Sequence, residues 1–268
     1  MEFQDRAKQH LSEYKLHKLG VTENGCWKRK NKEYTHILPF EYKQLNFLEN
    51  YRTELSGYIE DTHMHLHQDF HHLNSSQAAC LNFFYPLVEE DCFSKLLPIL
   101  QFDNETIKNY QFEKIVSRKE GTNFDFYLEL DSGKKVFFEI KYSEIGFGKA
   151  TDLPRYREKY ESVYKARLED KVNEGILLYP TLIKNYQLMR NISYVDPTSF
   201  LVIICPEGNR RVRQEYENVI YKILKPEYHS NIQLITWEAL VHELKSNLHQ
   251  KRLNEHYTMF EEKYLLMK

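Results

Sequence analysis

The sequence contains few cysteines, and none of them has the spacing of a common metal or redox motif. Cys26, Cys80, Cys92 and Cys205 form no CxxC pair, so we expect buried free thiols in a reducing compartment. The chain also lacks a recognisable signal peptide and any apolar run of membrane length. These absences predict a cytoplasmic protein that does not contact a membrane. Internal repeats and low-complexity tracts are absent as well.

An excess of charge of one sign is also lacking. The 268 residues include 37 basic and 39 acidic side chains, for a net charge of −2. This excludes an indiscriminate polycation, so any surface for nucleic acid must be local. Aromatic residues are abundant at 14%. The length and composition therefore allow a sizeable core in one large α/β domain or two small ones.

The clearest pattern lies at residues 121–142, GTNFDFYLELDSGKKVFFEIKY, and it predicts a β-hairpin. Apolar and mostly polar residues alternate in both halves, and a period of two places each set on one face of a sheet. Between the halves, Asp131-Ser132-Gly133 is a turn sequence in which Gly133 suits a left-handed backbone. In the first strand, one face would carry Phe124, Phe126, Leu128 and Leu130.

The length of the turn predicts the register of this hairpin. A three-residue turn pairs Leu130 with Lys134 and thereby sets Asp125 opposite Glu139, on the face that carries Lys141. Two carboxylates at cross-strand distance repel each other unless a cation lies between them. A hard divalent ion bound by carboxylate oxygens would remove that repulsion.

Asp125, followed after thirteen residues by Glu139-Ile140-Lys141, resembles the D…ExK motif of the PD-(D/E)XK nuclease superfamily. Phe124 stands where the superfamily's name has proline, at a position that varies widely among its members. The chain is also similar to a restriction-endonuclease-like bacterial subgroup in HHLNSSQ at 71–77, NFF at 82–84 and KYSEIGFG at 141–148. The resemblance covers roughly residues 71–205.

This resemblance implies metal-assisted hydrolysis of phosphodiester bonds in DNA. Asp125, Glu139 and the backbone carbonyl of Ile140 would hold Mg²⁺, for which Mn²⁺ is a substitute. Glu113, in the preceding strand, is a candidate third acidic ligand. Lys141 would position or deprotonate the attacking water and stabilise the developing oxyanion. The competing interpretation is an ordinary cross-strand salt bridge on a solvated sheet face.

Three further side chains are candidate substrate contacts. Gln77 begins a helix capped by the preceding serines, and it either leans toward the metal site or belongs to the cap alone. Gln187 and Arg190 are three residues apart in a predicted helix, so one helix face can carry both. Arg190 could hold a phosphate, although a purely structural polar pair is the alternative. Other acidic candidates near the site are Glu89, Glu90 and Glu144.

Elsewhere, periodicity predicts a simple succession of elements. We expect helices at 1–19, 41–60, 154–170, 179–195 and 208–224, and strands at 110–118, 200–205 and 231–236. Residues 20–40 are expected to be irregular. Their basic run at 28–32 is either a solvated loop or a phosphate contact.

Together these elements predict an α/β protein with an α-β-β-β-α-β core, a mixed central sheet flanked by helices, and helical additions at both ends. Residues 1–70 would form an extension packed on a nuclease-like domain at 71–268, whose core is 71–205. The partner would be DNA, and double-strand cutting by this fold suggests a homodimer. The alternatives are a non-catalytic nucleic-acid-binding or assembly protein on this fold, or a zinc protein that uses the histidine cluster at 63–72.

Overall fold

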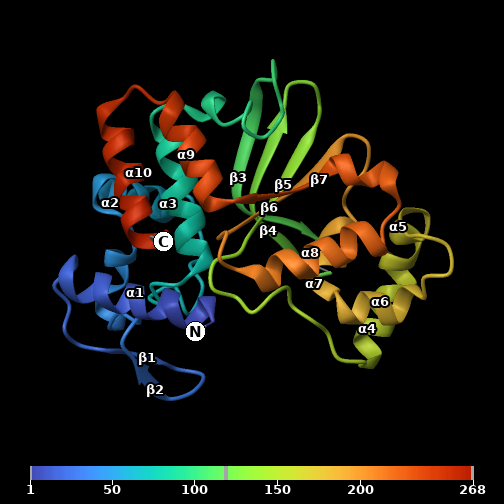
Figure 1. Ribbon diagram of the computed structural model, residues 1–268, viewed down its shortest axis with the longest axis horizontal. Coiled ribbons are helices and arrows are strands. Elements are labelled where there is room, and N and C mark those ends of the chain that lie inside the picture. The colour runs from blue at the N-terminus through green and yellow to red at the C-terminus, as the bar shows by residue number, and fades with distance from the viewer. Residues whose placement is uncertain (1, 118–119, 267–268) are drawn as a thin grey trace. The chain divides into compact units, whose positions relative to one another are not determined.

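The computed structural model in Figure 1 describes residues 2–117 and 120–266. It divides into two compact units. The first comprises Met1–Glu105, Pro206–Gly208 and Thr236–Lys268, and the second comprises Thr106–Cys205 and Asn209–Ile235. The chain therefore enters and leaves the second unit twice. The expected boundary at residue 70, between an N-terminal extension and a nuclease-like domain, stays a prediction.

The second unit is built on a five-stranded mixed sheet. Its strands lie in the order β3 (Ile107–Ser117), β4 (Thr122–Leu130), β5 (Lys135–Ile140), β6 (Ser199–Cys205) and β7 (Ile232–Thr236). The pairs β3–β4 and β4–β5 are antiparallel, whereas β5 and β6 run parallel. A parallel neighbour needs a crossover connection, and here the crossover is helical. This confirms the expected α/β class with a mixed central sheet.

The register of the β4–β5 hairpin agrees with the sequence-based prediction. The Leu130 N–H donates to the Lys134 carbonyl over 2.9 Å, and the pairs continue through Glu129↔Lys135 to Phe126↔Phe138. Gly133 in the turn has a φ of 87°, a left-handed conformation that glycine adopts without steric cost. Local turn chemistry therefore sets this register.

Helices cover one face of the sheet in the second unit (Figure 1). They are α4 (Pro154–Lys159), α5 (Lys165–Leu168), α6 (Leu178–Lys184), α7 (Tyr186–Ile192) and α8 (Arg210–Lys222). A cluster of buried side chains joins this face to the helices, with Phe137 from β5, Leu188 from α7 and Val219 from α8 among its members. The burial of such a cluster is the main source of stability in the unit.

β6 has the burial expected of a central strand. Four consecutive side chains, from Leu201 to Ile204, are each 0% exposed. Successive side chains in a strand point to opposite faces, so both faces of β6 are covered. The strand ends at Cys205, immediately before Pro206.

The first unit is mostly helical. Its elements are α1 (Phe3–His17), β1 (Gly25–Trp27), β2 (Lys32–Tyr34), α2 (Arg52–Asp61), α3 (Ser76–Glu89), α9 (Trp237–Asn247) and α10 (Lys251–Tyr264). The ring of Phe83 in α3 lies 5.1 Å from Trp237 and 5.5 Å from Tyr257 between centroids. These aromatic contacts join α3 to the two C-terminal helices, and the expected helices at both ends of the chain are confirmed.

Two expected elements differ from the structure. The single helix expected at 41–60 is divided into 3₁₀ turns, Phe40–Asn46 and Glu49–Tyr51, followed by α2. Tertiary hydrogen bonds take the backbone groups at the break, because the Leu48 N–H donates to Asn82 and the Asn46 carbonyl accepts from Asn82 and Lys263. Residues 20–40, expected to be irregular, contain the β1–β2 hairpin.

The helix expected at 179–195 is also interrupted, at Asn185 between α6 and α7. The four cysteines are free, as predicted, but Cys26 is exposed while Cys80, Cys92 and Cys205 are buried. Within the described parts of the chain, no helix combines the length and the apolar character needed to cross a membrane.

Candidate active site

The candidate site lies where β4 and β5 stop pairing. Beyond Phe126↔Phe138, the backbone N–H of Ile140 donates to Oδ2 of Asp125 over 2.6 Å. A side chain therefore takes the hydrogen bond that a strand partner would otherwise take. This interaction holds Asp125 beside the ExK segment at the end of β5.

Phe124 does not lie where the alternation predicted. Its ring packs against Phe137, at 4.5 Å between centroids, and against Tyr194, at 5.9 Å, so it lies on the opposite face from Phe126. On the neighbouring strand Glu113 has a φ of 49°, which is rare for a residue with a side chain. This backbone distortion beside Asp125 breaks the regular period of two.

Both carboxylate oxygens of Glu139 accept hydrogen bonds. The residue is 4% exposed. Its Oε1 accepts from Lys141 Nζ over 2.9 Å and from Gln187 Nε2 over 2.7 Å. Its Oε2 accepts from Asn191 Nδ2 over 2.7 Å. Two amides of α7 and one ammonium therefore set the orientation of this side chain.

Lys141 is buried with its charge satisfied. It is 5% exposed, and its Nζ also donates to Gln187 Oε1 over 2.9 Å. Desolvation opposes its charge, but the Glu139 and Glu144 carboxylates outweigh it and raise the pKa of Lys141 above its usual value. Lys141 is therefore an ammonium in this arrangement, and it donates hydrogen bonds rather than accepting a proton.

Asp125 lies in a region with too little positive charge. Desolvation, followed by the carboxylates of Glu139 and Glu113, raises the pKa of Asp125 well above its usual range. The Ile140 N–H and the Lys141 ammonium lower it, but they do not offset the other effects. A cation bound here would therefore relieve a repulsion already present in the protein.

The loop that follows β5 is held at both ends by α8. Asn209, the residue that caps α8, donates from Nδ2 to the carbonyls of Tyr142 over 3.1 Å and Glu144 over 3.0 Å. Glu215, one turn into the helix, accepts from the Phe147 N–H over 2.7 Å. The next N–H, that of Gly148, donates to the Gln187 Oε1 that also receives Lys141.

The space beside Gly146 in this loop is occupied by the end of the Glu215 side chain. The φ of Gly146 is 106°, and an added Cβ would lie 2.4 Å from the Glu215 carboxylate. The Phe147 ring lies 5.6 Å below the Lys141 ammonium. The loop therefore contacts α8 on one side. On the other side, the Phe147 ring contacts Lys141, and the Gly148 N–H shares the Gln187 Oε1 with Lys141.

Most of the residues singled out in the sequence lie together. Asp125, Glu139, Lys141 and Gln187 share one cluster, and Glu113 interacts electrostatically with Asp125 while its Oε2 accepts from Asn123 over 2.9 Å. Arg190 donates to Asn191 Oδ1 over 3.3 Å, and Asn191 in turn donates to Glu139.

Gln77 belongs to the first unit. Its carboxamide accepts from the His67 N–H over 2.8 Å and donates to the His65 carbonyl over 3.1 Å. Ser75, not Gln77, supplies the side-chain cap of α3, by accepting from the Ala78 N–H. Gln77 thus connects the histidine-rich segment to the start of α3.

Sequence reasoning missed Asn191, Asn209 and Glu215. Asn191 follows Gln187 by four residues, a spacing that places both on one helix face and could have indicated it. Asn209 precedes a helix and is a recognisable N-cap type. No local pattern indicates Glu215, because its partner is 68 residues away in the sequence.

The donor set suits a hard metal ion only in part. Within residues 2–117 and 120–266, no three His, Cys, Asp or Glu side chains form a ready group of metal ligands, the histidine cluster at 63–72 included. Two carboxylates with a backbone carbonyl are nevertheless a common set for Mg²⁺, which keeps several waters. Each oxygen of an ionised carboxylate can accept more than one interaction, so the hydrogen bonds of Glu139 are compatible with a metal.

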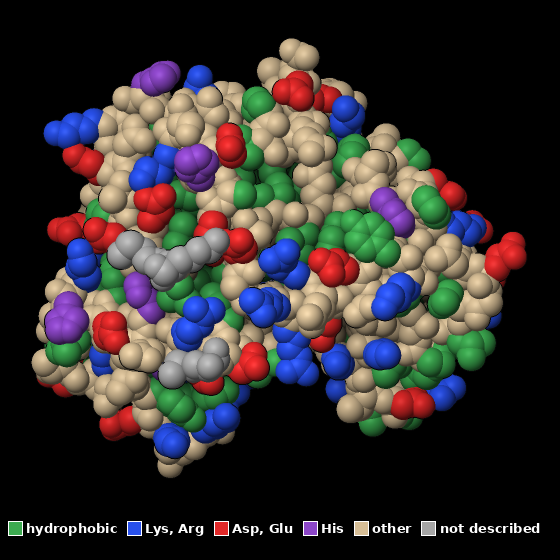
Figure 2. Space-filling model, in the orientation of Figure 1, with side chains coloured by type: hydrophobic (Ala, Val, Ile, Leu, Met, Phe, Trp, Pro, Cys, Tyr) green, Lys and Arg blue, Asp and Glu red, His purple; other side chains and the backbone are tan. Residues whose placement is uncertain are grey.

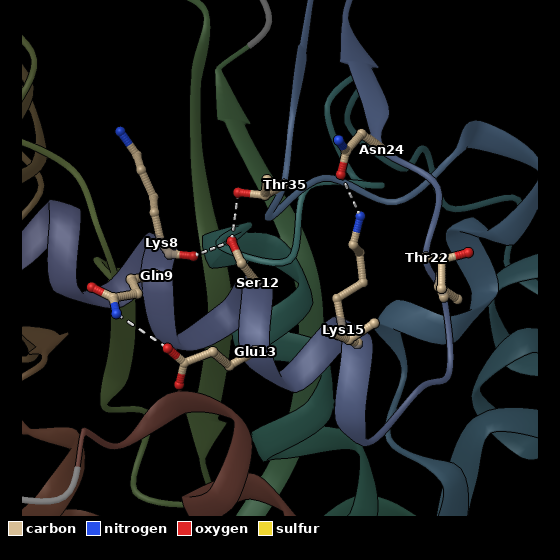
Figure 3. A pocket seen from close by; sticks show the side chains of 10 residues that line it. Lys8, Gln9, Ser12, Glu13, Lys15, Thr22, Asn24 and Thr35 are labelled. Atoms are coloured by element: carbon tan, nitrogen blue, oxygen red, sulfur yellow. Dashed lines mark hydrogen bonds between the residues drawn. The ribbon is translucent and has the colours of Figure 1, made fainter.

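A pocket of about 520 Å³ lies in the first unit, between α1 and the segment before β1 (Figure 3). Lys15 extends along its wall and donates to Asn24 Oδ1 over 2.9 Å. Ser12 donates to Thr35 on the other side. Three pairs of its lining side chains are hydrogen-bonded to each other, Gln9–Glu13, Ser12–Thr35 and Lys15–Asn24. None of the ten lining residues belongs to the carboxylate–lysine cluster.

A comparison with protein families supports the restriction-endonuclease-like character that the resemblance implied. The family model described as Restriction Endonuclease associating with ARP matches residues 8–265. No curated protein and no solved structure gives a significant match. The matched segment runs from α1 to the end of α10 and includes both units. The chain therefore belongs to the family Restriction Endonuclease associating with ARP.

Proposed function

We propose that the protein is a metal-dependent nuclease of the PD-(D/E)XK type that hydrolyses phosphodiester bonds of DNA. The catalytic residues would be Asp125, Glu139 and Lys141. The observation that carries the proposal is the buried Lys141–Glu139 ion pair beside Asp125, whose pKa is raised. Perturbed titratable groups gathered at a strand end are typical of functional sites. Membership of a restriction-endonuclease family supports the same conclusion.

A purely structural salt bridge accounts less well for this arrangement. Solvated ion pairs are exposed, whereas Glu139 and Lys141 are 4% and 5% exposed. A buried ion pair is a poor source of stability, because its desolvation offsets its attraction. The fold therefore gains little from this pair, and a chemical role explains why charged residues occupy the position.

The metal would be Mg²⁺, with Mn²⁺ as a substitute. Asp125, Glu139 and the backbone carbonyl of Ile140 would hold it, and Glu113 would add a further carboxylate. When bound, the ion lowers the pKa of a water and offsets charge on the scissile phosphate. The raised pKa of Asp125 supports a cation at this place.

The other side chains would orient and stabilise the reacting groups. Lys141 is an ammonium, so we assign it the positioning of the attacking water and the stabilisation of negative charge on phosphate oxygens. Gln187 would hold Lys141 and Glu139 at a fixed separation through its two amide atoms. Arg190 and Gln77 remain proposed substrate contacts.

Plasmid cleavage tests this proposal. Supercoiled DNA is incubated with wild type and with Asp125→Asn, Glu139→Gln and Lys141→Met, with Mg²⁺, with Mn²⁺ and with EDTA. These substitutions keep side-chain size and remove one charge each. The matched control is Glu129→Gln on the same hairpin, because Glu129 pairs with Lys108 outside the cluster.

We expect nicking or linearisation by wild type and the control that requires the metal, and a loss of about 10²-fold or more in the three variants. Cleavage that persists in Asp125→Asn and Lys141→Met would overturn the assignment. DNA left intact by wild type with each metal would favour the alternative, a non-catalytic nucleic-acid-binding or assembly protein on this fold.

Two partners belong to the same proposal. The description of the family includes association with ARP, and we extend that association to this chain. We also propose a homodimer, since cutting both strands of a duplex needs two sites. The molar mass in solution, measured by light scattering with and without DNA, tests the dimer.

A further inference from the structure

The β1–β2 hairpin of the first unit concentrates positive charge. Residues 25–34 carry four basic side chains, Lys28, Arg29, Lys30 and Lys32, and one acidic side chain, Glu33. Their net charge is +3, so the other 258 residues together carry −5. A polyanion approaching this chain therefore needs a local basic surface, and the hairpin provides one.

These charges are exposed and largely unneutralised. All four basic side chains are exposed. Arg29 forms the single ion pair among them, with Asp69 at 3.8 Å, while the ammonium groups of Lys28, Lys30 and Lys32 have no carboxylate within 4.0 Å among the described residues. Figure 2 shows basic and hydrophobic side chains together at the lower left of the view, where Figure 1 labels β1 and β2.

The three lysine ammonium groups lie over aromatic rings. Lys30 Nζ lies 4.5 Å from the centroid of Trp27, and Lys32 Nζ lies 5.5 Å from that of Tyr34. Lys28 lies 4.9 Å from the centroid of Phe40. A ring attracts the cation but leaves its full charge in place. The rings thereby restrict the side chains, which reduces the entropy lost when an anion binds.

The hairpin is also firmly docked at its base. The Gly25 N–H donates to the Ile37 carbonyl over 2.9 Å, and an added Cβ on Gly25 would lie 2.0 Å from the Leu38 carbonyl oxygen. The Trp27 ring meets His72 edge-on at 5.8 Å between centroids. Lys32 lies in β2, whereas Lys28, Arg29 and Lys30 lie in the turn between β1 and β2. The charges are therefore presented on a short turn whose flanking strands are docked on the unit.

We propose that this basic hairpin, residues 25–34, contacts the phosphate backbone of duplex DNA. Exposed lysines clustered at the turn of a docked hairpin suit a row of phosphates, which duplex DNA provides at about one charge per 1.7 Å of helix axis. The rings face the lysines and the body of the unit, so binding would be electrostatic and independent of base sequence. The choice of DNA rests on the nuclease activity proposed for the second unit.

Binding by the hairpin would assist that activity through the covalent connection of the two units. A chain held on DNA by one surface presents its other surface at a high effective concentration. The hairpin would then lower the DNA concentration needed for cleavage without taking part in the chemistry. We accordingly expect it to act on KM and to leave kcat unchanged.

The test measures binding and cleavage separately. A fluorescent 20-base-pair duplex is titrated with full-length protein in EDTA, at several KCl concentrations, by fluorescence anisotropy. The hairpin variant is Lys28→Gln with Lys30→Gln and Lys32→Gln. The matched control is Lys135→Gln with Lys222→Gln and Lys251→Gln, three exposed lysines outside the hairpin that give the same change in net charge. The single variant Lys30→Gln is measured in parallel, in case the triple variant does not fold.

We expect the hairpin variant to lose about tenfold or more in affinity at 0.1 M salt, and the slope of log K against log[salt] to fall by about three, or by about one for Lys30→Gln. The control should bind like wild type. Equal affinity of hairpin variant and wild type would overturn the proposal, as would an equal loss in the control or tighter binding of an RNA duplex.

Measuring cleavage alongside binding distinguishes a failure of the hairpin proposal from a failure of the proposed nuclease activity. Wild type that binds through the hairpin but cuts nothing would support the hairpin and overturn the nuclease. Metal-dependent cutting with the same KM in wild type and hairpin variant would overturn the hairpin and support the nuclease. Neither binding nor cutting of DNA by wild type would overturn both.

Discussion

Asn191 donates a hydrogen bond from Nδ2 to Oε2 of Glu139 over 2.7 Å. The guanidinium of Arg190 contacts the other end of the same amide, Oδ1, at 3.3 Å. A guanidinium can only donate, so the atom facing it must be the amide oxygen, and the NH₂ group must face Glu139. Arg190 therefore orients the amide that orients the carboxylate.

Asn191→Asp should reduce cleavage strongly, because it places a second carboxylate against Glu139. Groups that orient metal ligands typically change metal affinity or activity by about 10- to 100-fold, and we expect a loss in that range. The measurement is kcat and KM for DNA at several Mn²⁺ concentrations. Asn247→Asp, on an exposed position of α9, controls for the added charge. Equal activity of both variants and wild type would show that the amide has no positioning role.

Gly146→Ala should impair activity through the loop that follows β5. The new Cβ would lie 2.4 Å from the Glu215 carboxylate at a φ of 106°, so either that carboxylate or the loop must shift, and the contact of Glu215 with the Phe147 N–H would weaken. Gly133→Ala is a matched control, because its φ is 87° but nothing lies within 4 Å of the added Cβ. Both variants should lose about 1 kcal/mol of stability from backbone strain.

Cleavage rates and thermal melts together test this difference. A fall in kcat confined to Gly146→Ala is the expected result. If Gly133→Ala lost as much activity at the same stability, the hydrogen bond between the Phe147 N–H and Glu215 would not be needed for cleavage.

Divalent cations should stabilise wild type but not Asp125→Asn. An ion bound only by the folded protein adds about 2.7 kcal/mol to the free energy of unfolding at a hundred times its Kd. Differential scanning fluorimetry with Mg²⁺, Mn²⁺ and EDTA measures this without any nuclease assay. In EDTA at neutral pH, Asp125→Asn should melt above wild type, since the raised pKa of Asp125 means that its charge is unfavourable in the folded state. The same metal-induced rise in both proteins would place the ion elsewhere.

Stability should fall as the pH drops from about 6.5 to about 4, and His256 should account for part of the loss. It is 1% exposed, and burial lowers its pKa from 6.5 to about 4. In this range the unfolded chain binds a proton that the folded protein excludes, so acid favours unfolding. The shift corresponds to a free energy on the order of 3 kcal/mol. His36 and His72 shift in the same direction, each to about 4.

Urea unfolding at pH 7, 6, 5 and 4 measures this dependence. His256→Gln should be less stable than wild type at pH 7, because its contact with the Asn82 carbonyl is altered, yet its stability should change less with pH. An unchanged pH dependence in this variant would mean that His256 does not carry the linked proton.

Much of the site could be predicted because it is local in sequence. The register that brings Asp125 beside Glu139 follows from a three-residue turn and a period of two, and the pairing through Phe126↔Phe138 confirms it. The alternation failed at Phe124, where the distorted backbone of Glu113 on the neighbouring strand breaks the period of two and the ring packs against Tyr194, 70 residues away. The helix expected at 41–60 failed for a similar reason, since side chains from elsewhere in the first unit take its backbone hydrogen bonds.

The amino-acid order alone specifies the hairpin, the carboxylate pair and the ExK triplet, because turn geometry and side-chain alternation act between near neighbours. Only the folded structure determines the contacts that residues distant in sequence make with the site. Gln187 and Asn191 reach Glu139 across 48 and 52 residues, and α8 holds the following loop. The charge of Lys141 is likewise a property of the folded chain, because burial and nearby carboxylates exist only after β5, α7 and the loop have come together.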